Sequence, residues 1–125
     1  EDYMDEEKMR EIYYKYLSDL SEIDEAKAAC KDRKADIDTD WEISRSMCRE
    51  ENEMISEFVV KYGESEETLL LRKHMGIFYE QEEADFRKQK NILEDEYRTL
   101  LQREQSIEEE YRKWSLCEDT EDNNG

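Results

Sequence analysis

The chain has 125 residues, a length typical of one domain, and carries 19 lysines and arginines against 37 aspartates and glutamates, a net charge of −18. This charge argues against nucleic-acid binding, which needs cations opposite the phosphates, and against an anionic membrane surface. Proline is absent and glycine occurs three times, so the chain lacks the turn residues of β-hairpins and phosphate-binding loops. We therefore expect an all-α protein of long helices.

Apolar residues recur at steps of three and four through the first half of the chain, the spacing that keeps side chains on one face of a helix. This stripe runs from Met9 to Tyr62 with a few polar interruptions, and charged residues flank it. The pattern predicts a helix over about residues 4–62. Asp36–Asp40 contains residues that are poor in helix interiors, so a kink or a break there stays open as an alternative.

The clearest punctuation of the chain follows this stripe. Gly63 suits the left-handed residue that ends a helix, and Ser65 suits the N-cap of the next one. A turn at 63–65 and a second helix over about 66–117 therefore give a single antiparallel, coiled-coil-like hairpin over residues 1–117. The acidic tail 118–125 contains no apolar residue and is expected to be disordered.

The two stripes also predict which residues face each other. Folding the chain at Gly63 pairs positions whose numbers sum to about 129. Phe86 then faces Trp41, and Lys27 comes close to Glu104 as a paired polar layer. Polar layers of this kind tend to fix the register of helices at a cost in stability.

No arrangement of residues indicates catalysis or a bound metal or cofactor. His74 is the single histidine, so the Glu-x-x-His pairs of a di-iron bundle are absent. Cys30, Cys48 and Cys117 lack zinc-site spacing and lie too far apart along a hairpin to bridge, which favours reduced thiols in a reducing compartment. A two-helix hairpin offers no substrate cavity. We expect no enzyme activity, no cofactor and no metal.

The location of the protein is also an expectation from the sequence. The chain shows no signal peptide and no apolar run near the roughly 20 residues that span a bilayer. We therefore expect a cytoplasmic protein that does not bind membranes.

Apolar residues near the turn exceed what one seam between two helices can bury. Phe58-Val59-Val60 and Leu69-Leu70-Leu71 are runs of three, and three consecutive residues span about 200° of a helix. Some of this surface should contact a helical partner. The candidate partner-binding residues are Val59, Val60, Leu69, Leu70, Ile77 and Phe78. Self-association into a four-helix homodimer is the alternative.

The second half of the chain carries a family resemblance. Leu70–Glu83 (LLRKHMGIFYEQEE) and Phe86–Tyr97 (FRKQKNILEDEY) resemble the small helical partner proteins of LXG-domain effectors, WXG100-like hairpins of type VII secretion in Gram-positive bacteria. The resemblance implies a chaperone or adaptor that binds the helical N-terminal LXG domain of a toxin effector, beside a second small helical partner, and promotes its secretion. It also implies co-export with the effector.

The chain departs from this family at its bend. The bend here is Tyr62-Gly63, whereas relatives with a Trp-x-Gly turn have a tryptophan there, and the nearest tryptophan is Trp41. Aromatic residues followed four positions later by an acid, the spacing of the family's export signal, occur about as often as chance predicts. A self-associating structural coiled-coil scaffold therefore stands as the alternative function.

Overall fold

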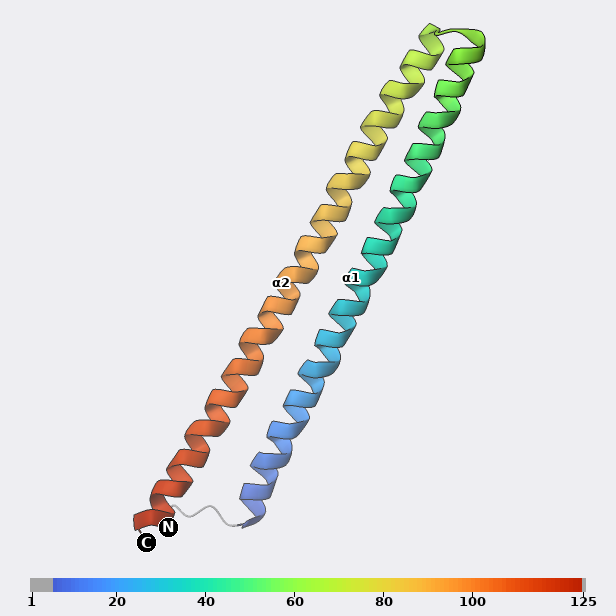
Figure 1. Cartoon of the computed structure of the whole chain (residues 1–125). Coiled ribbons are helices and arrows are strands. Elements are labelled where there is room, and N and C mark those ends of the chain that lie inside the picture. Colours follow the sequence, from blue (N-terminus) through green and yellow to red (C-terminus); the bar gives the residue numbers. More distant parts are fainter. Residues whose placement is uncertain (1–5, 125) are drawn as a thin grey trace. The chain divides into compact units, whose positions relative to one another are not determined.

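The computed structural model describes the backbone of residues 6–124 and the side chains of residues 6–115. Helix α1 spans Glu6–Tyr62 and helix α2 spans Glu66–Asn124, and no strand occurs over 6–124 (Figure 1). The all-α helical hairpin predicted from the sequence is therefore confirmed. The predicted start of the first helix at residue 4 lies outside the described residues.

The turn between the helices is held by its own capping contacts. Gly63 has φ 86°, in the left-handed region, and its N–H donates to the Val59 carbonyl at 2.7 Å. The Thr68 N–H donates to Ser65 Oγ at 3.2 Å, and the Ser65 N–H donates to Thr68 Oγ1 at 2.9 Å. This reciprocal pair is a capping box with threonine in the third position. The structure thus has the turn at 63–65, as expected.

Helix α1 continues through Asp36–Asp40 without a break. Thr39 Oγ1 donates to the Ala35 carbonyl at 3.0 Å, so its hydroxyl bonds within the helix and does not cap a new one. The alternative of three helices is therefore not what the structure has. The segment contains neither proline nor glycine, the residues that most often end a helix.

Helix α2 extends further than expected. Its backbone is helical to Asn124, beyond the helix end near residue 117 and the disordered tail over 118–125 that the sequence predicts. No proline or glycine lies between Gly76 and Gly125, so no residue of this stretch forces the helix to stop. Residue 125 and the side chains from 116 onward lie outside the described part.

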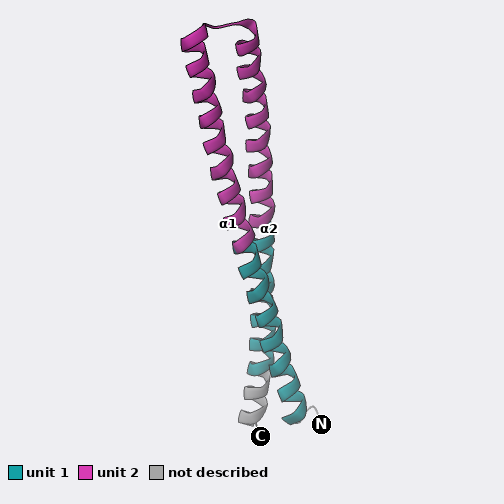
Figure 2. Ribbon diagram, turned by 90° about the vertical axis from the view of Figure 1, so that its right-hand side faces the viewer, with its two compact units in different colours: residues 1–31, 95–125 teal, residues 32–94 magenta. Residues whose placement is uncertain are grey.

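The chain divides into two compact units, each built from a segment of α1 beside a segment of α2 (Figure 2). Unit 1 comprises residues 1–31 and 95–125, and unit 2 comprises residues 32–94 with the turn. Unit 1 is centred on Ile23, which is 1% exposed. There Lys27 Nζ lies 3.2 Å from Glu104 Oε2, which confirms the predicted polar pair.

Aromatic rings extend the contact between the helices of unit 1. Tyr16 stacks on Tyr111 with ring centroids 4.1 Å apart, and Tyr111 also contacts Tyr13 and Trp114. Stacked and tilted aromatic pairs add roughly 0.5–1.5 kcal/mol beyond the area that they bury. Aromatic contacts therefore supplement a buried core that contains few aliphatic side chains in this unit.

Unit 2 has a narrow seam, the line along which its two helices touch. Trp41 contacts Phe86 with ring centroids 5.2 Å apart, as predicted. A polar contact joins the helices on each side of this pair. Toward the turn, Ser44 Oγ donates to Glu82 Oε2 at 2.6 Å, and away from the turn, Lys90 Nζ lies 2.9 Å from Asp38 Oδ1. These pairs fix the register of the two helices in unit 2.

Candidate partner-binding surface

The surface of unit 2 is organised by the two flanks of its seam. An α-helix turns about 100° per residue, so the residues directly before and after a seam residue lie on opposite flanks. The residues along the seam are buried or half-buried, and they include Trp41, Ser44, Cys48, Ile55 and Val59 on α1 and Thr68, Met75, Tyr79, Phe86 and Leu93 on α2. A shallow hollow lies on each flank.

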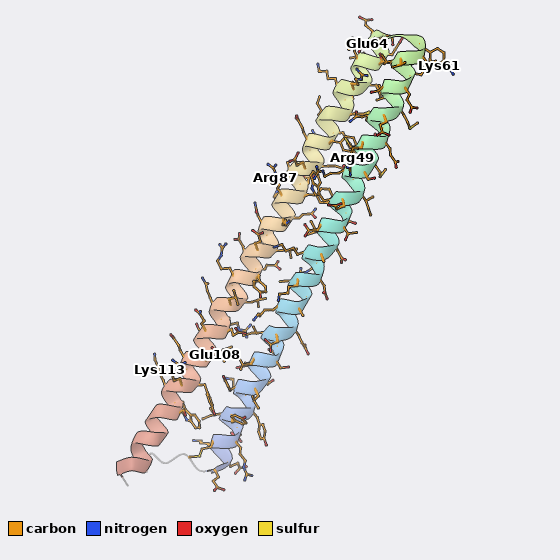
Figure 3. All side chains as sticks on the ribbon, in the orientation of Figure 1. Arg49, Lys61, Glu64, Arg87, Glu108 and Lys113 are labelled. Atoms are coloured by element: carbon orange, nitrogen blue, oxygen red, sulfur yellow. The ribbon has the colours of Figure 1, made fainter. Side chains whose placement is uncertain are left out.

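One flank, called the charged flank below, carries residues that directly follow seam residues. Its hollow, about 610 Å³, has charged walls that include Arg45, Arg49, Arg87, Lys90, Asp38, Glu80 and Glu83. Figure 3 labels Arg49 on α1 and Arg87 on α2. Several of these charges are paired: Arg87 Nη2 lies 2.6 Å from Glu83 Oε1, and Arg45 stacks over the Trp41 ring. Water and ion pairs suffice to solvate such a surface.

The opposite flank carries apolar residues that directly precede seam residues. Its hollow, about 570 Å³, brings Met54 and Phe58 of α1 together with Leu71 of α2, near the turn. Further along α1 from the turn, Met47 and Ile43 also directly precede seam residues and lie on the same flank. We call these residues, with Phe78, the apolar strip: Ile43, Met47, Met54, Phe58, Leu71 and Phe78.

The register of unit 2 places Phe78 within this strip. Phe78 directly precedes the seam residue Tyr79, and the Tyr79 hydroxyl donates to Glu51 Oε2 at 2.9 Å. Phe78 therefore lies at a level between Met47 and Met54 of the neighbouring helix. The strip therefore has members on both helices along this level of unit 2.

All six side chains of the strip are between 49% and 68% exposed. Covering a half-exposed Met, Leu, Ile or Phe contributes roughly 1 kcal/mol per side chain. Contiguous exposed apolar surface on a small protein marks an interaction site more often than scattered single residues do. The strip can therefore bind an apolar surface, and it holds no group suited to chemistry.

The structure brings only one of the six candidate partner-binding residues into the strip, namely Phe78. Leu70 and Ile77 each follow a seam residue by two positions, so they project from the outer side of α2. Leu69 follows Thr68 and lies on the charged flank. Val59 is half-buried in the seam.

Val60 is 88% exposed and lies next to Val59 on α1, away from the strip. Three further strip residues, Ile43, Met47 and Met54, were missed because they lie outside the two runs of three apolar residues. Phe58 and Leu71 lie within these runs but were assigned to the seam. The sequence does contain a pattern that marks the strip. Ile43, Met47, Met54 and Phe58 form a second apolar stripe, in which each residue directly precedes a seam residue.

Hydrogen bonds to carboxylates raise the pKa of groups beside the seam. Partial burial, with the hydrogen bond to Glu51, raises the pKa of Tyr79 to about 12, so Tyr79 remains a donor through neutral pH. The hydrogen bond to Asp38 raises the pKa of Lys90, and the one to Glu104 raises the pKa of Lys27. These shifts extend toward higher pH the range in which Tyr79, Lys90 and Lys27 stay protonated.

Comparisons of the chain with protein-family models, with curated proteins and with solved structures find no match. Within residues 6–115, no three His, Cys, Asp or Glu side chains are grouped so that they could hold a metal ion. Neither helix, over its described residues, contains a segment apolar and long enough to cross a membrane.

Proposed function

We propose that this protein acts by binding, without catalysis, as a chaperone or adaptor that covers an apolar stripe on a helical partner. The observation that carries the proposal is the apolar strip of unit 2, where six half-exposed side chains line one flank of the seam. The opposite flank consists largely of charged residues. The strip thus offers an apolar surface for a partner, and the charged residues of the opposite flank would keep a complex in solution.

The geometry of the strip favours a helix as the bound element. Ile43, Met47, Met54 and Phe58 follow one another at steps of four and seven, the spacing that accepts the side chains of a packed helix. From Ile43 to Phe58 the strip is about 22 Å long, which a helix of about four turns covers. A third helix in this groove would bury the strip on both α1 and α2.

The partner that the resemblance implies is the helical N-terminal LXG domain of a toxin effector, beside a second small helical protein. The proposal in this form is a cytoplasmic targeting complex of type VII secretion, with export of the whole complex as its final step. What supports it is the exposed apolar strip together with the likeness of Leu70–Glu83 and Phe86–Tyr97 to that family.

The test is an affinity capture from the source cells, with mass spectrometry and light scattering on the eluted complex. Three forms are compared: the unchanged protein, the strip variant Met54→Ser/Phe58→Ser, and the outer-face variant Leu70→Ser/Ile77→Ser. Both variants remove two exposed apolar side chains, so they are matched. We expect the strip variant to bind the partner about 30-fold more weakly and the outer-face variant to bind it with unchanged affinity.

The outcomes separate the candidate functions. A large co-purifying protein with a helical N-terminal domain, lost from the strip variant alone, supports the chaperone proposal. Loss from the outer-face variant alone would place the binding surface at Leu70 and Ile77, contrary to the proposed site. A homodimer with nothing else bound would favour the self-associating scaffold.

A further inference from the structure

The charges around the apolar strip are almost all negative. From this we infer that the strip takes a helix from a different protein, with lysine and arginine along the edges of its apolar face. The inference rests on the proposed function and adds the chemistry of the partner to it. It excludes a second copy of this chain as the occupant.

The border of the strip is defined by helical spacing. Residues three or four positions from a strip residue are its neighbours on the helix surface. The acidic, basic and histidine neighbours of the strip are Asp40, Glu50, Glu51, Glu57, Lys61, Glu67, His74 and Glu82. Six of these eight are acids and one is a lysine, so the border is strongly negative at neutral pH.

The acidic border is a local feature and not only a reflection of the net charge. The hollow on the charged flank of the same unit is lined by Arg45, Arg49, Arg87 and Lys90 together with three acids. Cations thus concentrate on one flank and acids around the strip on the other. A helix that docks on the strip meets Glu50 and Glu57 along α1 and Glu67 on α2, whereas Glu51 and Glu82 are hydrogen-bonded within the hairpin.

Docked in the groove, such a helix would place its edges beside these acids. Glu50 and Glu57 are seven residues apart on α1 and form one edge, and Glu67 lies on α2 beside Leu71. Lysine or arginine at matching positions would pair with them at the rim of the interface. Rim charges of this kind set partner choice and the rate of association more than the final affinity.

A second copy of this chain fits the strip poorly. Two strips facing each other would bring two acidic borders together, on chains that each carry a net charge of −18. Like charges that face each other across an interface disfavour the pair. The apolar surface therefore needs a cover of the opposite charge, which this chain does not supply at the strip.

The experiment uses the full chain and three synthetic helical peptides of about 18 residues, the length that spans the strip. The peptides share one leucine and phenylalanine face and differ at its edges, which carry lysine, glutamine or glutamate. Fluorescence anisotropy measures the dissociation constants at about 0.05 M and about 0.5 M NaCl. We expect the lysine-edged peptide to bind about tenfold tighter than the glutamine-edged one at low salt, and the glutamate-edged one most weakly.

General attraction between a basic peptide and an acidic protein is controlled by a matched pair of variants. Glu50→Gln/Glu57→Gln removes two charges from the border. Glu42→Gln/Glu53→Gln removes two charges from the same helix at positions that border no strip residue. We expect the border variant to raise the dissociation constant of the lysine-edged peptide about fivefold. The control variant should change this dissociation constant less than about twofold.

The possible results distinguish a failure of the charge inference from a failure of the proposed function. Equal binding of all three peptides, lost in Met54→Ser/Phe58→Ser, would overturn the inference and leave the proposed function standing. Equal effects of the two glutamine variants would also overturn the inference, since the attraction would be general. Binding that does not respond to Met54→Ser/Phe58→Ser would overturn both, because no helix would then use the strip.

Discussion

The two flanks of unit 2 share one seam and the same two helices, yet their surfaces differ in kind. On the charged flank Arg87 pairs with Glu83 and Lys90 with Asp38, so many of the charges are satisfied within the chain. On the other flank Met54, Phe58 and Leu71 surround a hollow with no cover among the described residues. One flank pairs many of its charges within the chain, and the other leaves its apolar side chains about half exposed.

The difference between the flanks arises from a displacement of one residue along the helix. Arg45 directly follows the seam residue Ser44, and Ile43 directly precedes it. Because each residue turns the helix by about 100°, this step decides which flank a side chain joins. An acidic hairpin can therefore carry a distinct apolar surface without any stretch of sequence that is apolar overall.

The largest expected effect on stability comes from a seam residue, in contrast to the strip residue beside it. Ile55 is buried and Met54 beside it is exposed. We expect Ile55→Ala to lower the free energy of unfolding by about 2–3 kcal/mol, and Met54→Ala to change it by less than about 0.5 kcal/mol. Urea denaturation followed by circular dichroism measures both. Equal losses would mean that Met54 is already covered in the free chain.

A smaller effect is expected on the charged flank, at Gly76. Gly76 lies inside α2 and lines the hollow of this flank, and a Cβ added there meets nothing within 4 Å. We expect Gly76→Ala to raise the free energy of unfolding by about 0.8 kcal/mol, because alanine favours helix more than glycine does. Thermal denaturation checks this.

The same variant sharpens the comparison of the two flanks. If the partner docks only on the apolar strip, Gly76→Ala leaves its affinity unchanged. A weaker partner affinity in this variant would show that a partner side chain enters the hollow beside Gly76, and the charged flank would then be an interface as well.

The smallest expected effect is at high pH. The pKa of Tyr79 is raised from 10.0 to about 12, so its contribution to stability is complete below pH 10 and is lost as the pH rises toward 12. The raised pKa values of Lys27 and Lys90 act in the same direction at high pH. Denaturation at several pH values should show a smaller decline for Tyr79→Phe than for the unchanged chain. An identical decline in both would contradict a role for Tyr79.

The sequence by itself determined the fold. The three-and-four spacing of apolar residues, the left-handed Gly63 and the N-cap Ser65 are local signals, and each acts within a few residues. The register was also predictable, since Lys27 with Glu104 and Trp41 with Phe86 follow from folding two stripes at one glycine. The C-terminal end of α2 was less predictable, because the acidic residues of the tail 118–125 neither end a helix nor require one.

The surface of unit 2 was decided by tertiary structure. The excess of apolar residues near the turn selected Leu69, Leu70 and Ile77, but the direction of these side chains depends on the phase of the seam at Thr68 and Met75. An error of one residue in that phase moves a side chain by about 100°, from one flank to the other. Contacts such as Ser44 with Glu82 and Tyr79 with Glu51 fix the phase, because they join the two helices at one rotation.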